Sequence, residues 1–485
     1  MKALFLRHKK KLIALGVLIA APIIAHVAVG HAARLTPPAI TLPHAKVTHP
    51  APGLRTVGRD YARRRGSIYE VRLTGTPTQI GYYHARLLYP EMVENEGIVW
   101  NLFRDYVPSS VARTLLLDLA QFRYRHVDRD MSEARRQEIA AGAVGFSPDP
   151  YKNYFDTYQR FVYLNALYDI SLSFEHSPLI GCTTFTLTGN AVAGGGTLLA
   201  RNFDFEADDI FDTKKAVFLV EENGKIPFAS VAWPGLVGVF SGMNEKGLAV
   251  VVHGGRAGQP RTYGEPVAHA LRRVLQTATT TDEAIAALAQ REPMVSHIVI
   301  LDDATGHAAA VERVPGRPQF VRRLGEKATV TNHFEGPSAN DPKNITVEKK
   351  TSTLPRRHRG DELLRQLDHP ATVADAVALL RDRRGVGGKK LPLGDRRAIG
   401  ALIATHGVVM DTTHRTLWVS EAPHLLGRFI EFDLRRLLDP HFNPRTDEPP
   451  ITSIPADPLL TSGAYARWRK AHPKRHELPK TAGRH

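Results

Sequence analysis

Cysteine is almost absent from this chain, since Cys182 is the only one among 485 residues. A lone cysteine cannot form a disulfide within the chain, and it cannot build a metal site from several thiolates. It is therefore either a buried apolar side chain or a reactive thiol. Free cysteine is usually buried, so the residues around Cys182 have to decide between the two interpretations.

Acidic residues are also scarce relative to basic ones, with 49 Asp and Glu against 64 Lys and Arg and a formal charge of +15. Part of the excess lies in residues 461–485, and no zinc-finger, RNA-binding aromatic or P-loop pattern accompanies it. We therefore expect no nucleic-acid partner. The charge indicates solubility or a preference for anionic surfaces.

Patterns for metals and cofactors are missing as well. His253, His333 and His406 have no ligand spacing between them. The glycines at 194–196 lack the helix and lysine that follow in a phosphate-binding loop, so they predict a hairpin turn. We expect no metal and no cofactor.

The N-terminus carries a basic segment, residues 7–11, followed by an apolar run from Leu12 to about Gly30. This order is typical of an export signal. The run is about nineteen residues long, just enough to span a bilayer. Small residues before Ala33 fit a cleavage site, so two alternatives stay open: a cleaved signal peptide, giving a periplasmic or secreted protein, or an uncleaved anchor, which we favour.

Residues 1–33 are accordingly expected to be a signal peptide or membrane anchor through which the protein contacts a membrane. A Pro-rich linker follows at 34–54. Helical periodicity predicts that 55–181 are mostly helical after a first strand near 67–73, with the first helix at 79–94. Residues 440–485 are Pro-rich and basic, and we expect a loosely ordered tail.

The pattern changes at Gly181 from helical to strand-like. Short β-prone runs separated by turns predict strands at 185–188, 197–200, 216–220, 228–232, 237–240, 248–252, 296–301, 308–314, 328–331, 408–410, 416–420 and 429–432. Helices are expected at 267–278, 282–291, 361–367 and 373–382. Strands, then helices, then strands without strict alternation predict an α+β layered fold.

Cys182 needs a positive charge or a base nearby to become a thiolate. None of the 22 histidines stands in a recognisable Cys/His/Asn pattern. If the Gly181–Cys182 bond is cut, the freed α-amine has a pKa near 8 and can act as the base. Arg201 can favour the thiolate and Asp204 can hold the α-ammonium, but alternation along a strand would require a bend or bulge to bring them together.

Four motifs occur in order along the chain: residues 181–183 (GCT), 198–205 (LLARNFDF), 242–249 (GMNEKGLA) and 330–334 (VTNHF). Together they resemble the N-terminal-nucleophile (Ntn) hydrolases. The chain is most similar to the acyl-coenzyme A:6-aminopenicillanic acid acyltransferase family, also called isopenicillin N acyltransferase-like. Choloylglycine hydrolase and acid ceramidase are more distant relatives. The resemblance covers residues 67–435.

This resemblance implies an αββα sandwich of two antiparallel sheets with a helical N-terminal pro-segment. It implies a zymogen that cuts itself between Gly181 and Cys182. Residues 55–181 would form an α-chain that stays associated with a β-chain, 182–439, as a heterodimer.

The resemblance also implies roles for individual residues. Cys182 is the nucleophile, and Arg201 and Asp204 assist its thiolate and α-amine. Asn332 supplies an oxyanion donor, a role that suits a fixed amide N–H. Arg356, after the serine-containing turn at 352, completes the set, with Arg357 as the alternative.

The sequence departs from the bile-salt branch of these enzymes at one place. Where that branch has an asparagine after its Gly-Leu-Ala strand, this chain has Val251-Val252-His253-Gly254-Gly255. A second oxyanion donor would have to be a backbone N–H or His253.

The sequence thus predicts a C–N amide hydrolase or acyltransferase whose thioester is resolved by water or an amine. Its substrate would be a small acyl amide or a peptide-like compound. The linker and basic tail favour a lipid-like acyl chain. Two alternatives remain: an unprocessed thiol hydrolase with a histidine base, and a non-catalytic, membrane-tethered binding domain with the same fold.

Overall fold

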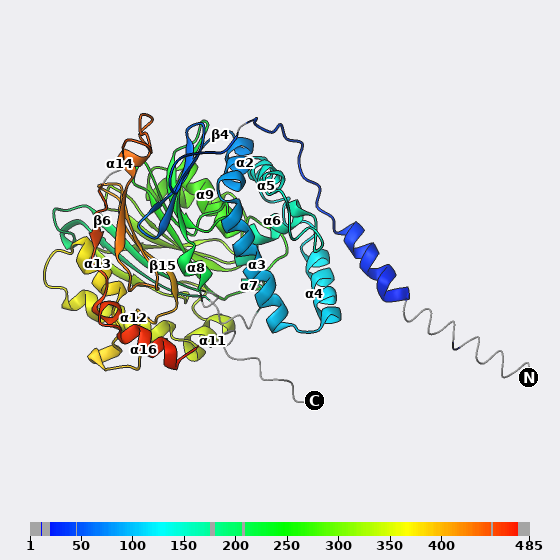
Figure 1. The fold of residues 1–485 in the computed structure, drawn as a ribbon. Coiled ribbons are helices and arrows are strands. Elements are labelled where there is room, and N and C mark those ends of the chain that lie inside the picture. Colours follow the sequence, from blue (N-terminus) through cyan, green and yellow to red (C-terminus); the bar gives the residue numbers. More distant parts are fainter. Residues whose placement is uncertain are drawn as a thin grey trace, which may run out of the picture.

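The computed structural model of the chain describes residues 11, 20–44, 46–174, 180–205, 209–447 and 450–473 (Figure 1). Most of the expected signal segment lies outside them, as does the end of the tail from residue 474. Within the described residues, the longer strands belong to two sheets. The large sheet has the strand order β1 (Thr48–Ala51), β2 (Leu54–Val57), β3 (Asp60–Arg65), β4 (Ile68–Gly75), β7 (Ala216–Glu222), β8 (Phe228–Ala232), β9 (Ser241–Asn244), β10 (Ala249–Gly254), β11 (His297–Asp302), β12 (Ala308–Arg313) and β13 (Phe320–Leu324).

The small sheet carries both ends of the predicted catalytic region. Its order is β14 (Lys327–Val330), β5 (Ile180–Thr188), β6 (Thr197–Phe205), β15 (Ala404–Asp411), β16 (Thr416–Ser420), β17 (Phe429–Asp433) and β18 (Ser453–Ile454). All its pairs are antiparallel.

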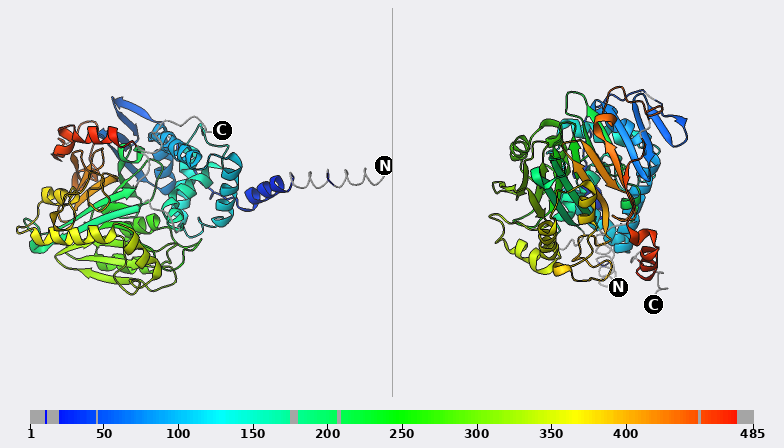
Figure 2. Two further views of the ribbon diagram at one scale, coloured as in Figure 1. Left: turned by 90° about the horizontal axis from the view of Figure 1, so that it is seen from below. Right: turned by 90° about the vertical axis from the view of Figure 1, so that its left-hand side faces the viewer.

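The helices form the outer layers (Figure 2). Those before Cys182 are α2 (Pro77–Leu87), α3 (Tyr89–Tyr106), α4 (Ser110–Arg123), α5 (Glu133–Gly145), α6 (Thr157–Asn165) and α7 (Leu167–Leu172). Those after it are α8 (Ile210–Thr213), α9 (Val267–Thr277), α10 (Thr281–Ala289), α11 (Pro342–Lys350), α12 (Thr353–Gln366), α13 (Val373–Leu380), α14 (Leu434–Leu437), α15 (Pro458–Thr461) and α16 (Ala464–Ala471). Two short 3₁₀ turns lie at Gly189–Ala191 and Val386–Gly388.

Three buried clusters show how the layers stack. Because side chains alternate along a strand, each sheet has two apolar faces. The inner faces pack together through residues such as Val217 and Ile300 of the large sheet and Leu199 and Val408 of the small sheet. The outer face of the large sheet packs on α2, α5, α6, α9 and α10, and that of the small sheet packs on α12 and α13. The expected αββα sandwich is confirmed.

One strand pair departs from the antiparallel rule. Strand β4, from the segment before Cys182, pairs in parallel with β7, from the segment after it. The helical part of the N-terminal segment therefore begins only at Pro77, because residues 54–75 form three strands of the large sheet. Strand β3 gave little signal in the sequence because its arginines look solvent-exposed. Arg63 and the Tyr61 hydroxyl instead hydrogen-bond the buried carboxylate of Glu70.

The prediction of a strand at 237–240 is wrong. This segment is irregular, and β9 starts only at Ser241. Its backbone bonds to the helical layer instead of to a strand: Val237 N donates to Asn165 Oδ1, and Val239 N donates to Ala268 O. By contrast, α9 and α10 begin within a residue of the expected positions, and Thr280 caps α10 by accepting from Glu283 N.

The two ends of the chain contain more structure than expected. Residues 20–32 are helical, and the following turn is fixed because Gln159 Nε2 donates to the buried Ala33 O at 3.0 Å. At the other end, β18 pairs with β17, and the Tyr465 ring of α16 packs against His424. Among the described residues, no helix is both long and apolar enough to cross a membrane.

Candidate active site

Cys182 lies on β5 at the point where one of its two neighbouring strands ends. On one side β5 pairs with β6 along its whole length, with Cys182 opposite Phe203. On the other side the pairing with β14 stops at Thr184. The Asn332 side chain, just beyond β14, replaces the missing strand because its Oδ1 accepts from Cys182 N at 2.7 Å. The nitrogen of the predicted cleavage junction is thus held by a side chain.

The thiol of Cys182 points into the inner layer and is fully buried. Arg201 Nη2 donates to Sγ at 3.3 Å, and Sγ lies 3.9 Å from Val252 O. Burial raises the pKa of the thiol, while the charge of Arg201 opposes this increase. Arg201 is therefore placed next to the thiol, and its role in stabilising a thiolate stays a prediction.

Arg201 is held by residues that the sequence did not single out for this role. Its Nη1 donates to Ser241 Oγ at 2.5 Å and to His406 Nε2 at 3.1 Å, and Nη2 also donates to Val252 O. Its guanidinium stacks over the Phe203 ring at 4.2 Å. Burial and the charge of Arg201 lower the pKa of His406 well below its usual value, so His406 accepts as a neutral ring. Ser241 and His406 come from β9 and β15, and no local pattern links them to Arg201.

Asp204 and Arg356 reach the same junction from the opposite face of the small sheet. Asp204 lies opposite Gly181 across β5 and β6, and a Cβ atom added to Gly181 would be 3.4 Å from Asp204 Oδ2 and 3.8 Å from Arg356 Nη2. Burial raises the pKa of Asp204 to about 6, against the lowering effect of Arg356 and Arg201. Arg201 and Asp204 thus flank Cys182 from two faces, and β6 needs no bend to bring them together. The bulge lies in β15, between Ala404 and His406.

Arg356, and not Arg357, is the arginine at the junction. It stands in the first turn of α12, where its Nε donates to Ser352 Oγ. Its Nη1 donates to Cys182 O and to Thr183 Oγ1, and its Nη2 donates to Asn332 Oδ1 at 2.9 Å. Arg357 instead pairs with Glu335 and Asp361.

Asn332 presents its oxygen to the junction in this uncut chain. The two donors on Oδ1, Cys182 N and Arg356 Nη2, fix the orientation of the amide. One N–H bond of Nδ2 donates to Gly254 O at 3.0 Å. Because the Nδ2 group has two N–H bonds, the role of Asn332 as an oxyanion donor stays a prediction.

His253, the other candidate oxyanion donor, is engaged elsewhere. Its Nε2 bonds with Thr184 Oγ1 at 2.7 Å and its Nδ1 with Thr331 O at 3.1 Å. Burial lowers its pKa well below the usual value. Within the described part of the chain, no histidine hydrogen-bonds to Cys182, which leaves the thiol without an imidazole base.

An apolar cavity of 240 Å³ lies near Cys182, which is not itself one of its lining residues. Phe203, the cross-strand neighbour of Cys182, forms part of its wall. The rest comes from α3, α6, α7 and α8, from the end of β6 and from the segment between β8 and β9, with these members: Met92, Asn95, Glu96, Val99, Phe161, Leu164, Leu167, Tyr168, Ser171, Phe205, Phe211, Trp233, Pro234, Gly235, Leu236 and Phe240. The site therefore combines a polar, charged junction with an apolar chamber. No cluster of metal ligands occurs among the residues described.

A protein-family model matches part of the chain. The acyl-coenzyme A:6-aminopenicillanic acid acyl-transferase family matches residues 192–389. The matched segment contains Arg201, Asp204, Asn332 and Arg356, and it begins after Cys182. The family resemblance indicated by the sequence motifs is confirmed over these residues, and the match supports an enzyme of the acyltransferase type.

One curated relative is an uncharacterized protein of Archaeoglobus fulgidus, 25% identical over 202 residues. The alignment covers 38% of this chain and 32% of the relative, so the chain spans about a third of that protein's length.

Three solved structures are also similar to this chain. The ortholog of N-acylethanolamine-hydrolyzing acid amidase from Caenorhabditis elegans has 17% identity and a TM-score of 0.33, over 48% of this chain and 93% of that one. A mutant of conjugated bile acid hydrolase from Clostridium perfringens has 13% identity and a TM-score of 0.36, over 57% of this chain and 97% of that one. Penicillin V acylase from Agrobacterium tumefaciens has 19% identity and a TM-score of 0.36, over 52% of this chain and 92% of that one.

Proposed function

We propose that this chain is a self-processing cysteine enzyme that acts on the amide bond of an acyl compound, as a hydrolase or acyltransferase. The arrangement around Cys182 carries the proposal. Its backbone nitrogen is held by Asn332, its thiol contacts Arg201, and Asp204 and Arg356 face the preceding peptide bond. With no imidazole on the thiol, the α-amine that cleavage would free is the base within reach.

Self-cleavage starts from the thiol of Cys182. Sγ attacks the carbonyl carbon of Gly181, so a C–S bond forms, the peptide C–N bond breaks and the thiol proton moves to the departing nitrogen. Water then hydrolyses this thioester, which leaves a carboxylate on Gly181 and a free α-amine on Cys182. Asn332 Oδ1 already holds that nitrogen, and Asp204 supplies a negative charge for the ammonium form.

Catalysis then uses the same atoms on an external amide. The α-amine accepts the thiol proton, Sγ attacks the acyl carbonyl, and the protonated amine gives its proton to the leaving amine. The acyl group stays on Cys182 as a thioester. Water or a second amine releases it, and the α-amine accepts the proton of the attacking molecule.

We place the acyl group in the apolar cavity. Phe203 and Tyr168 belong to the cavity wall and lie near Cys182, and most lining side chains are apolar, with Asn95, Glu96 and Ser171 as polar exceptions. Such a chamber favours a lipid-like acyl chain over a charged, peptide-like one, because a charged group would lose its hydration there without a partner. The substrate class proposed is therefore an amide of an apolar carboxylic acid.

The release of amine from a series of acyl amides of increasing chain length tests this function. We expect the cleaved wild-type protein to turn over the longer amides, and we expect alkylation of its thiol to stop the reaction. A cleaved protein that hydrolyses no amide, or only short ones, would contradict the proposal.

Filling the cavity should separate acyl recognition from chemistry. Leu164→Trp projects a larger ring into the chamber from α6, and we expect it to reduce turnover of a dodecanoyl amide on the order of tenfold while leaving that of an acetyl amide unchanged. Val144→Trp, at an exposed position on α5, is the matched control. Equal losses for both amides would indicate damage to the fold and not an acyl site.

Two further parts of the proposal concern the whole chain. The segments on either side of residue 181 would stay together as two chains, because β4 and β7 are neighbours in one sheet. The basic and apolar N-terminal sequence supports export, with the body tethered to the outer side of the membrane or released from it.

A further inference from the structure

Helix α4 exposes an apolar stripe. Val111, Leu115, Leu119 and Phe122 lie at intervals of four, four and three residues, which places them on one side of a helix. Their exposed fractions run from 49% to 67%. Scattered exposed apolar side chains are ordinary, but a row of four on one helix marks an interaction surface.

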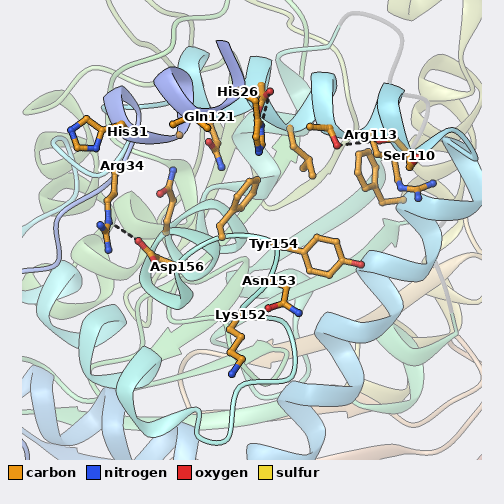
Figure 3. Close-up of a pocket in the computed structure, with 18 residues that line it drawn as sticks. His26, His31, Arg34, Ser110, Arg113, Gln121, Lys152, Asn153, Tyr154 and Asp156 are labelled. Carbon is orange, nitrogen blue, oxygen red and sulfur yellow. Dashed lines mark hydrogen bonds and ion pairs between the residues drawn. The ribbon is translucent and has the colours of Figure 1, made fainter. Parts of the chain in front are cut away.

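The N-terminal helix, residues 20–32, leaves the body near α4 (Figures 1 and 2). His26 Nδ1 bonds with Asp118 of α4 at 2.8 Å, and Arg34 pairs with Asp156 at the base of the helix, so a groove forms between the helix and the body (Figure 3). This helix also exposes apolar side chains, namely Ile23, Ile24 and Val27, of which Val27 lines the groove. The two apolar surfaces thus belong to one end of the molecule.

Charge and sequence indicate what covers this end. The Arg125 guanidinium stacks over the Phe122 ring at 4.3 Å, and Arg123 is exposed next to it. Ahead of the N-terminal helix, the sequence continues with apolar residues 12–19 and the basic residues 7–11. Apolar side chains with basic neighbours fit the headgroup region of a bilayer that contains anionic lipids.

We propose that the α4 stripe rests on the surface of an anionic bilayer, next to the point where the N-terminal segment enters it. The structure also connects this contact to the apolar cavity. Tyr124, which follows α4, hydrogen-bonds through its hydroxyl with Ser173 at the end of α7, and α7 lines the apolar cavity. The bilayer surface would lie at the cavity end of the molecule. Because binding to vesicles does not involve Cys182, this proposal can be tested whether or not the proposed amide chemistry holds.

A fluorescent label on α4 tests the contact. Leu119→Cys and, as an exposed control elsewhere, Val386→Cys are each introduced into the full-length chain that carries Cys182→Ala, so that an environment-sensitive dye reacts only at the new thiol. Both are mixed with vesicles of phosphatidylcholine and phosphatidylglycerol whose acyl chains carry bromine. We expect the label at 119 to be quenched and the label at 386 to be unaffected.

Other outcomes would overturn this proposal. A protein that sediments with the vesicles without quenching at 119 would be held by its N-terminus alone. A label at 119 that is shielded without lipid, in a particle of twice the mass by light scattering, would assign the stripe to a second copy of the chain. The triple variant Leu115→Gln, Leu119→Gln, Phe122→Gln should weaken vesicle binding at least tenfold, and unchanged binding would also contradict it.

Tyr168 raises a separate question, because its hydroxyl is buried and has no hydrogen-bond partner among the described residues. A buried hydroxyl without a partner costs free energy and needs an explanation. The ring packs against Phe203 and Phe240, and the hydroxyl lies 3.6 Å from where a Cβ atom on Gly254 would be. Burial and then the nearby Cys182 thiolate raise the pKa of Tyr168 well above its usual value, so its proton stays available to donate.

The geometry points to Tyr168 as the second oxyanion donor, a position for which His253 is not free. The hydroxyl would donate to the carbonyl oxygen of the substrate when Sγ adds to the carbon, with Asn332 as the other donor. No proton is transferred in this step. The inference depends on the proposed amide chemistry.

Tyr168→Phe, which removes the hydroxyl alone, tests this role. We expect the variant to cleave normally by intact mass and to lose roughly a hundredfold in kcat with KM little changed, because the donor acts on the transition state. A cleaved variant with wild-type kcat would overturn the role of Tyr168 and leave the proposed function intact. A cleaved wild-type protein without amide turnover would overturn both.

Discussion

Replacing Cys182 by alanine is expected to leave one uncut chain without amide turnover. The variant lacks the sulfur that attacks Gly181 in processing and the acyl carbonyl in catalysis. Its backbone nitrogen can still bond to Asn332, so the fold should persist. Intact-mass analysis of the wild type should show two fragments, the second beginning at Cys182, whereas Cys182→Ala should show one.

Val386→Ala, at an exposed position far from the junction in sequence, serves as the control and should be cut like the wild type. The wild type itself can refute the expectation in two ways. An uncut chain whose thiol reacts and which hydrolyses amides would be a thiol hydrolase with a histidine base. An uncut chain with an unreactive thiol would be a binding domain.

Asp204→Asn is expected to abolish activity and yet stabilise the uncut fold. Burial holds the pKa of Asp204 at about 6, above the usual value of 3.8, so the folded state disfavours the charged carboxylate. The amide imitates the protonated form, and at pH 8 it should raise the free energy of unfolding by about 1–3 kcal/mol. Activity should be lost because the α-ammonium of a cleaved chain would lack its anionic partner.

Because burial raises the pKa of Asp204, the stabilisation by Asp204→Asn should increase with pH. Below pH 3.8 Asp204 is protonated in both states, so the variant should gain nothing there. The penalty for ionised Asp204 grows as the pH rises through the interval to about 6, and it is complete above it. Urea unfolding of Cys182→Ala with and without Asp204→Asn, at pH 4 and pH 8, measures the difference. Asp368→Asn, at an exposed carboxylate, should change little at either pH, and equal gains at both pH values would contradict the burial argument.

The sequence predicted the parts of the site that lie close together along the chain. Gly181 and Cys182 precede Arg201 and Asp204 by one hairpin, and the alternation along β6 predicts that Arg201 and Asp204 point to opposite faces. The structure keeps them there and places Cys182 between them. Side chains on both faces of the small sheet can reach the junction at Cys182, so β6 needs no bend.

The contacts made over long sequence distances could not be predicted in this way. Ser241 and His406 hold Arg201 from two different sheets, and neither stands in a pattern that marks this role. The oxygen of Asn332 faces Cys182 because Arg356 also donates to it, which no single motif encodes. Strand β3 was missed for a related reason, since the charge of its buried Arg63 is neutralised by Glu70 of the neighbouring strand β4.

Strand β4 pairs in parallel with β7, so each half of the molecule covers a strand edge that the other half would otherwise expose. Cutting the chain at residue 181 would leave the large sheet continuous, since β4 comes from before the cut and β7 from after it. Either half made alone would expose an open row of backbone donors and acceptors along that seam, which is a template for aggregation. Production of the two halves from separate genes would therefore require simultaneous synthesis, whereas a single chain supplies them in equal number and in register.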